Sequence, residues 1–162
     1  MKKIIPILLS IALMLCVCSV SANAQFYNAN EIARTVVEYF EDGTVLRITV
    51  SEHISHIIPL ADTYIKSGTK TYTLEDANGN EIWWFNLHGS FKVSSGISAT
   101  CTSSSHSYSI QDNSWSLKSA TTSKSGSKAI GEATFIKKLL FVTTDTKDIS
   151  VTLTCDKNGN LS

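Results

Sequence analysis

The sequence predicts an all-β protein folded as a two-sheet β-sandwich, and three observations support this fold class. Short runs in which apolar and polar residues alternate recur along the chain, with turn residues between them at regular spacing. The runs are rich in Thr, Val, Ile, Tyr, Phe and Trp, which suit a pleated, half-buried surface. The 138 residues after position 24 fit one domain that buries roughly two thirds of its unfolded surface.

The N-terminus has the pattern of a cleaved signal peptide. Two lysines follow Met1, an apolar run extends from residue 4 to residue 20, and an A-x-A cleavage site ends at Ala24. We expect residues 1–24 to be removed, so that the secreted, extracellular chain begins at Gln25.

Two alternatives to cleavage are weaker. A lipid could be attached at Cys16 or Cys18, but Leu15 and Val17 before them are bulkier than the small residue that such a site prefers. An uncleaved anchor would need roughly 17 to 25 apolar residues, and the run is at the lower limit of that range. We therefore expect no membrane span in the mature chain.

Residues 25–68 are predicted to form an N-terminal β-hairpin and a connection. The runs T-V-V-E-Y-F (35–40) and T-V-L-R-I-T-V (44–50) flank E-D-G, whose residues tolerate the positive φ of a hairpin turn. Residues 51–68 break the pattern with Pro59 and Gly68, and we interpret them as a long connection. The sandwich core is then expected over residues 69–162.

Residues 81–93, E-I-W-W-F-N-L-H-G-S-F-K-V, are predicted to form a central strand. Successive side chains of a strand point to opposite faces, so Trp83 and Trp84 cannot both enter the same core. The odd-numbered positions carry no charge and almost no polar atoms, whereas the even-numbered positions are mixed. We therefore predict that Trp83 is buried and that Trp84 points outward.

The segment 94–127 is rich in Ser and Thr, a composition typical of linkers, yet apolar residues recur in it with period two. We interpret it as thin strands whose solvent face carries Ser and Thr, followed by a last hairpin. The residues in the inward phase are Ile97, Ala99, Cys101, His106, Tyr108, Ile110, Ala129, Gly131, Ala133, Phe135, Ile149, Val151, Leu153 and Cys155.

Two similar stretches, D-A-N-G-N at 76–80 and D-K-N-G-N at 156–160, could supply oxygen ligands to calcium. The first copy, however, has Glu81 and Leu87 where a calcium loop of the EF-hand type needs Gly and Glu. Tight turns in which Asn-Gly provides positive φ explain both copies, and we favour that interpretation.

Two cysteines remain after signal removal, Cys101 and Cys155, and both share the inward phase of their strands. Export takes them to an oxidising compartment, so we predict one disulfide between them. It would close a loop of about 55 residues and contribute on the order of 4 kcal/mol in the chain-entropy model. The spacing does not match that of a metal or catalytic pair.

The order Cys101, Trp115, Cys155 resembles the Cys, Trp, Cys pattern of immunoglobulin-like sandwiches. This resemblance implies an immunoglobulin-like or related topology in which the tryptophan packs on the disulfide. The chain departs from the pattern at Leu153, where such domains have a corner tyrosine, and in the short tail after Cys155.

Seven short motifs are spread over the mature chain: F-E-D-G-T (40–44), G-T-K-T-Y-T (68–73), G-S-F (89–91), S-A-T-C-T (98–102), W-S-L-K-S (115–119), K-S-G (124–126) and V-T-L-T-C-D-K-N-G-N-L-S (151–162). Together they resemble a family of small, functionally uncharacterised proteins that are secreted by Gram-positive bacteria of the Clostridia type. The resemblance covers nearly the whole mature chain and implies export and a compact β domain.

Charge and motifs argue against several function classes. The full chain has 14 basic and 14 acidic residues, and loss of Lys2 and Lys3 leaves the mature chain with a net charge of about minus two, so it lacks the charge pattern for nucleic acid or for an anionic membrane surface. The H-x-x-H of His53 and His56 lacks a third metal ligand. Because no nucleophile motif or carboxylate pair is evident, we predict no catalytic residues, no metal site and no cofactor.

A carbohydrate is the first ligand class that the sequence indicates. An outward Trp84, with Asn86 and His88 on the same face, resembles a sugar-binding strand: an aromatic plane for the sugar ring and polar groups for its hydroxyls. The alternative is that the N-terminal hairpin or the 51–68 connection covers Trp84, since large aromatic side chains are mostly buried. We expect a non-catalytic binding or surface-interaction module whose partner could be a cell-surface glycan or protein.

The second candidate surface is the apolar stretch Leu139, Leu140, Phe141 and Val142, at a position where a hairpin connection is expected. Four apolar residues in a connection are unusual unless they pack or bind. The alternative function is therefore a secreted effector or bacteriocin-like factor that acts on target cells through this loop.

Overall fold

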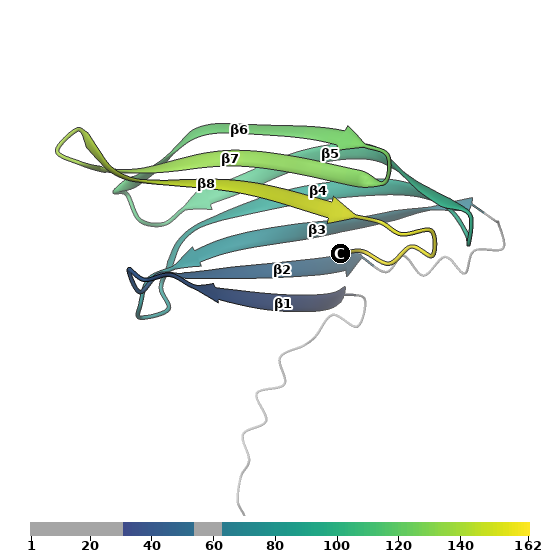
Figure 1. Cartoon of the computed structure of the whole chain (residues 1–162), viewed down its shortest axis with the longest axis horizontal. Coiled ribbons are helices and arrows are strands. Elements are labelled where there is room, and N and C mark those ends of the chain that lie inside the picture. Colours follow the sequence, from purple (N-terminus) through teal and green to yellow (C-terminus); the bar gives the residue numbers. More distant parts are fainter. Residues whose placement is uncertain (1–30, 54–62) are drawn as a thin grey trace, which may run out of the picture.

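The computed structural model describes residues 31–53 and 63–162, and the regular elements there are all β-strands. Five strands form one sheet in the order β1-β2-β3-β4-β5, and β6-β7-β8 form a second sheet that packs against its inner face (Figure 1). The predicted two-sheet β-sandwich is therefore confirmed. The strands are β1 Glu31–Tyr39, β2 Val45–His53, β3 Thr63–Glu75, β4 Glu81–Ser94, β5 Ser98–Ile110, β6 Trp115–Ser125, β7 Lys128–Leu139 and β8 Val142–Thr154.

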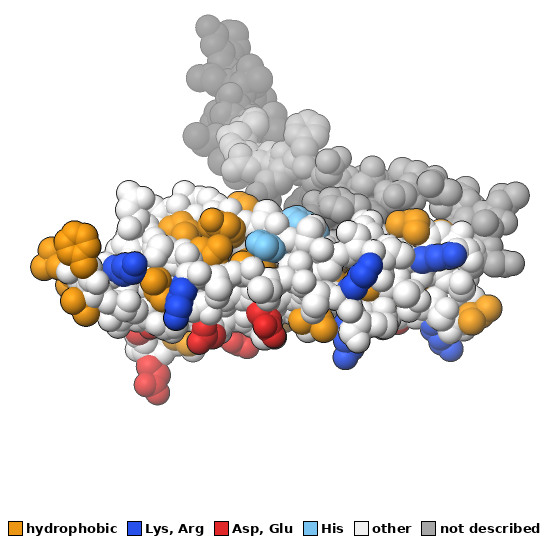
Figure 2. Space-filling view, turned by 90° about the horizontal axis from the view of Figure 1, so that it is seen from above, with side chains coloured by type: hydrophobic (Ala, Val, Ile, Leu, Met, Phe, Trp, Pro, Cys, Tyr) orange, Lys and Arg blue, Asp and Glu red, His pale blue; other side chains and the backbone are white. Residues whose placement is uncertain are grey.

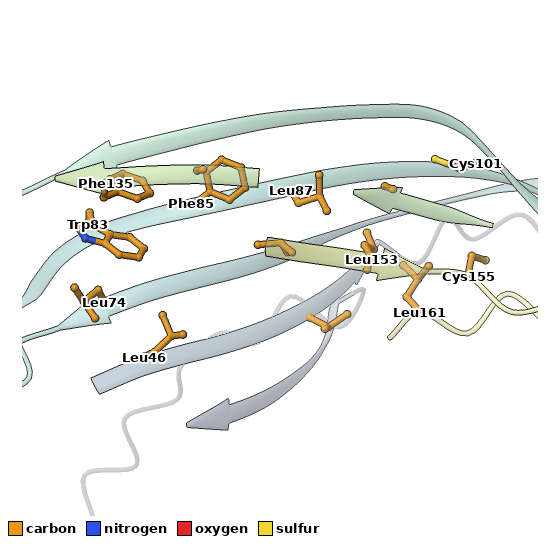
Figure 3. Packing of buried hydrophobic residues seen from close by; sticks show 14 of the residues in the cluster. Leu46, Leu74, Trp83, Phe85, Leu87, Cys101, Phe135, Leu153, Cys155 and Leu161 are labelled. Carbon is orange, nitrogen blue, oxygen red and sulfur yellow. The ribbon is translucent and has the colours of Figure 1, made fainter. Parts of the chain in front are cut away.

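Each sheet is an antiparallel meander, in which every strand pairs with its neighbours in sequence. This simple order differs from the Greek-key connections of immunoglobulin-like sandwiches. Trp115 also packs elsewhere, because its ring centroid lies 6.4 Å from that of Trp83. Figure 3 shows Trp83 at the end of the core opposite to Cys101 and Cys155. The spacing of two cysteines and a tryptophan contains no information on strand order, so the meander order could not be derived from it.

The predicted N-terminal hairpin is present as β1 and β2. Its turn is closed by a hydrogen bond from Phe40 N to Thr44 O, and Gly43 has a φ of 80°. The hairpin is not separate from the core, however, because β2 pairs with β3 along nine positions. The expected boundary after residue 68 falls inside β3, and the expected connection is strand at both of its described ends, 51–53 and 63–68.

Two charged residues lie on the inner face of this part of the sheet. Glu52 on β2 is buried and forms an ion pair with Lys66 on β3 at 2.8 Å. Glu52 also accepts a hydrogen bond from the backbone N–H of Leu161, and this bond holds the C-terminal segment against the sheet. The two charges compensate each other, so the inner face can bury them. The expectation of a connection depended on Pro59, which lies outside the described residues, and on Gly68, which lies within β3.

The core lies between the two sheets and follows the predicted phase of β4 (Figure 3). Trp83 is buried and stacks on Phe135 of β7, with ring centroids 4.1 Å apart. Most of the inward residues predicted in the last three strands are also buried, and so are both cysteines. Ile97 is an exception, because β5 begins only at Ser98. Ile97 therefore lies in the exposed turn between β4 and β5.

The two Asn-Gly stretches form the same tight turn. Oδ1 of Asp76 accepts hydrogen bonds from the backbone N–H groups of Asn78 and Asn80, both at 2.8 Å, and Asp156 does the same for its own copy. Gly79 and Gly159 have φ values of 82° and 85°. The carboxylates are occupied by their own loops, as the turn interpretation predicted.

Candidate binding surfaces

The outer face of the five-stranded sheet brings the predicted carbohydrate-binding residues into one row. Trp84, Asn86 and His88 alternate along β4 with buried residues of the inner face. In the strand register, β3 places a threonine and β5 a serine beside each of them. The neighbours are Thr73 and Ser109 for Trp84, Thr71 and Ser107 for Asn86, and Thr69 and Ser105 for His88.

The ring of His88 is held across three strands. Its Nδ1 lies 2.9 Å from Oγ1 of Thr69 on β3, and its Nε2 lies 2.9 Å from Oγ of Ser107 on β5. A neutral imidazole donates from one nitrogen and accepts at the other, and hydroxyl groups can serve in either role. His88 is therefore a fixed part of the surface, and its orientation is set before any ligand arrives.

The side-chain oxygen of Asn86 has no hydrogen-bond donor in the part of the chain that the structure describes. This oxygen, Oδ1, is buried. A buried carbonyl oxygen without a donor is costly, and such groups in folded proteins call for an explanation. Because the oxygen is buried, a ligand hydroxyl can donate to it only if the Asn86 amide turns outward.

Trp84 is half-buried, in contrast to its fully buried neighbour Trp83. The β1–β2 hairpin does not lie over Trp84, because both strands continue the same sheet beyond β3. Residues 54–62, the rest of the possible cover, lie outside the described residues.

Arg47 on β2 lies on the same outer face, two strands away from Trp84. It forms two hydrogen bonds of 2.9 and 3.0 Å with Glu75, and these lower the pKa of the Glu75 carboxyl.

The second predicted surface is the apolar tip, residues 139–142, which joins β7 to β8. Its exposed fractions are 65% for Leu139, 85% for Leu140, 99% for Phe141 and 64% for Val142. Figure 2 shows these apolar side chains gathered at one end of the molecule, next to Lys or Arg side chains. As predicted, the stretch is a hairpin connection, and it does not pack on the described part of the protein.

The backbone of the apolar tip is strained. Leu140 has a φ of 48° and Phe141 a φ of 72°, so both central residues of the two-residue turn are left-handed. Turns of this kind strongly prefer Asn-Gly, and a left-handed residue with an ordinary side chain costs about 1–2 kcal/mol. Neither turn geometry nor core packing accounts for Leu and Phe here.

The predicted disulfide is not present in the structure, where Cys101 and Cys155 are free and buried. Their backbone N–H groups donate to the neighbouring carbonyls of Gly126 and Ser127, so both cysteines adjoin the turn between β6 and β7. Burial raises the pKa of both thiols, to about 11 for Cys155. As thiols they are poor nucleophiles at neutral pH.

Sequence reasoning missed a cavity of about 380 Å³ between the sheets. It opens where the inner face of β2 and β3 extends past β8, because five strands face three. Phe40, Leu46, Tyr72 and Trp83 line one side and Ile149 lies on the other. Strand patterns do not specify how many strands each sheet receives, so no sequence signal marks this cavity.

No group of three or more His, Cys, Asp or Glu side chains in 31–53 and 63–162 is placed to hold a metal ion. His53 is the last residue of β2, and His56 lies outside the described residues. In the same part of the chain, no helix has the length and apolar character needed to cross a membrane.

No family model, curated protein or solved structure matches the chain.

Proposed function

We propose that the protein is a secreted, non-catalytic binding module that holds a carbohydrate on the outer face of its five-stranded sheet. The observation that supports this is the row of Trp84, Asn86 and His88 between two lines of hydroxyl groups. An indole ring packs against the C–H face of a sugar, while hydroxyl, amide and imidazole groups bond its hydroxyls.

The chemistry of this face favours a neutral ligand. Its central positions carry no charged side chain, and the nearest pair, Arg47 and Glu75, neutralises itself. Asn86 lies between the indole and the imidazole on β4, so its amide is a neutral polar group at the centre of the row. A neutral cell-surface glycan therefore fits better than a sulfated or phosphorylated one.

The test is retention on immobilised glycans and peptidoglycan. We expect the wild type to be retained and Trp84→Ala to lose at least about tenfold in affinity, because covering a large apolar side chain contributes roughly 1.5–3 kcal/mol. Tyr39→Ala is the matched control, since Tyr39 is an aromatic residue on the edge strand β1 with 81% exposure. Equal loss in both variants, or no retention of the wild type, would refute the proposal.

We also propose that the chain acts after export, with residues 1–24 removed and Cys101 joined to Cys155. The support is the leader pattern and the burial of both cysteines beside one turn. Mass spectrometry of culture supernatant should find a chain that begins at Gln25 and is two mass units lighter than the reduced form. An intact Met1, or a lipid on Cys16 or Cys18, would contradict export by this route.

A further inference from the structure

The apolar tip lacks a structural role within the described protein. Phe141 and Leu140 are almost fully exposed, and their side chains contribute nothing to the core. The turn would be less strained with Asn-Gly, the pair that the same chain uses at 78–79 and 158–159. Two large apolar residues in a strained, exposed turn indicate a surface that contacts something outside the molecule.

The surroundings of the tip are basic on the β7 side. Lys137 and Lys138 directly precede it, both are exposed, and neither is in an ion pair with another described residue. Across the hairpin, Asp145 is 3.6 Å from Lys147, which neutralises it. The pKa of Asp112 is lowered mainly by hydrogen bonds with Ser114 and to a smaller extent by the charge of Lys137, so Asp112 is an acidic group near Lys137.

The position and shape of the apolar tip favour a lipid bilayer over a protein as its partner. The tip projects at one end of the elongated molecule (Figures 1 and 2) and forms a narrow wedge rather than a flat patch. A protein interface of standard size needs about 800 Å² on each partner, which a two-residue turn does not provide. A lipid bilayer, in contrast, accepts a small apolar wedge in its acyl region and lysines among its anionic headgroups.

We propose that residues 139–142 insert into the surface of a lipid bilayer, with Lys137 and Lys138 contacting anionic headgroups. The net charge of the chain did not indicate an affinity for anionic headgroups. Lys137 and Lys138 form a local positive charge at the tip, and acidic residues elsewhere in the chain balance it in the sum. The site is independent of the carbohydrate surface, since it belongs to the other sheet.

The first test separates the apolar side chains from the fold. Purified protein is sedimented with vesicles of phosphatidylcholine alone and of phosphatidylcholine with phosphatidylglycerol. The double variant Leu140→Asn with Phe141→Gly should relieve the strained turn and raise Tm, yet lose at least about tenfold in vesicle affinity. Ile97→Asn is the matched control, because Ile97 is an exposed apolar residue in another turn, and it should bind like the wild type.

The second test concerns charge. Replacement of Lys137 and Lys138 by Gln should weaken binding to the anionic vesicles by roughly 5- to 30-fold and remove its salt dependence, since each surface lysine contributes about fivefold. Binding to phosphatidylcholine alone should not change.

Three results would overturn the proposal: no sedimentation of the wild type with either vesicle, undiminished binding of the Asn-Gly variant, or a dimer in sedimentation velocity that this variant abolishes. The last would show that the tip binds a second copy of the chain. Trp84→Ala should leave vesicle binding unchanged, which distinguishes failure here from failure of the carbohydrate proposal.

Discussion

The two faces of the five-stranded sheet have opposite chemistry, and β4 contributes the centre of both. On the inner face, Trp83, Phe85 and Leu87 are fully buried against the second sheet. On the outer face, Trp84 and Asn86 stand among threonine and serine hydroxyls. The backbone and the neighbouring strands are the same for both sets, so the difference is in what each face must contact.

This difference shows which residues the fold requires. The inner face needs large apolar side chains, because they fill the space between the sheets. An outer strand face needs only residues that suit a pleated surface, such as the threonines of β3. A half-buried tryptophan and a buried carbonyl without a donor are not required there, which is why the outer face is the candidate site.

The largest expected effect comes from exchanging each tryptophan for alanine. Trp83→Ala should destabilise the protein by about 3–5 kcal/mol, because it leaves a cavity beside Phe135. Trp84→Ala should cost only about 1 kcal/mol, since its side chain is half-buried and packs on no second sheet. Urea denaturation of both variants measures the two costs.

An equal loss of unfolding free energy in Trp83→Ala and Trp84→Ala would contradict the proposed difference between the two faces. Trp84 would then be as well packed as Trp83, and its ring would not be available to a ligand. Trp84→Phe provides a further check, because it should restore most of any lost stability but only part of the sugar affinity.

Much of the fold could be predicted from the alternation of side chains. The opposite orientation of Trp83 and Trp84, the inward phase of Phe135 and Leu153, and the β1–β2 hairpin all follow from period two and turn chemistry. The three β4 residues of the outer face were predicted together for the same reason, since they are separated by two positions.

What could not be predicted depends on contacts between distant segments. The strand at 63–68 was missed because Gly68 indicates a break in the sequence pattern. Gly68 lies within β3, where a larger side chain would collide with the distant residue Leu161. The hydroxyl groups beside Asn86 come from β3 and β5, and only the register places them there. The strained backbone at Leu140 contradicts local turn preferences and could not be inferred from them.

An intermediate effect is expected from the cysteines, which belong to the inner face. If Cys101 and Cys155 are joined in the secreted protein, reduction should lower its stability by about 2–5 kcal/mol. Residues 102–125 should lose hydrogen-exchange protection first, because their outward Ser and Thr bury little apolar area. A thiol titration tests the bond directly. Two free cysteines in the natively secreted protein would contradict the Cys101–Cys155 disulfide.

The smallest expected effect is on the charged margin of the outer face. Arg47 lowers the pKa of Glu75 mainly through their hydrogen bonds, and nearby charge adds to this. A carboxyl whose pKa is lowered by folding stabilises the protein fully above its unfolded pKa, and this contribution is lost as the pH falls through the folded pKa. Stability should therefore decline below about pH 4.3, the ordinary value for Glu, and Glu75→Gln should decline less steeply.

The change should be small, because Arg47 is 44% exposed and water screens the pair. Thermal melts of wild type and Glu75→Gln between pH 3 and pH 6 measure it, and Glu132→Gln is the control, since Glu132 is an exposed carboxyl on β7. The Tm of the wild type and that of Glu75→Gln should differ at pH 6 and converge toward pH 3. If they keep a constant difference across this range, the Arg47–Glu75 pair does not act through charge, and the outer face is stabilised by its hydroxyl network alone.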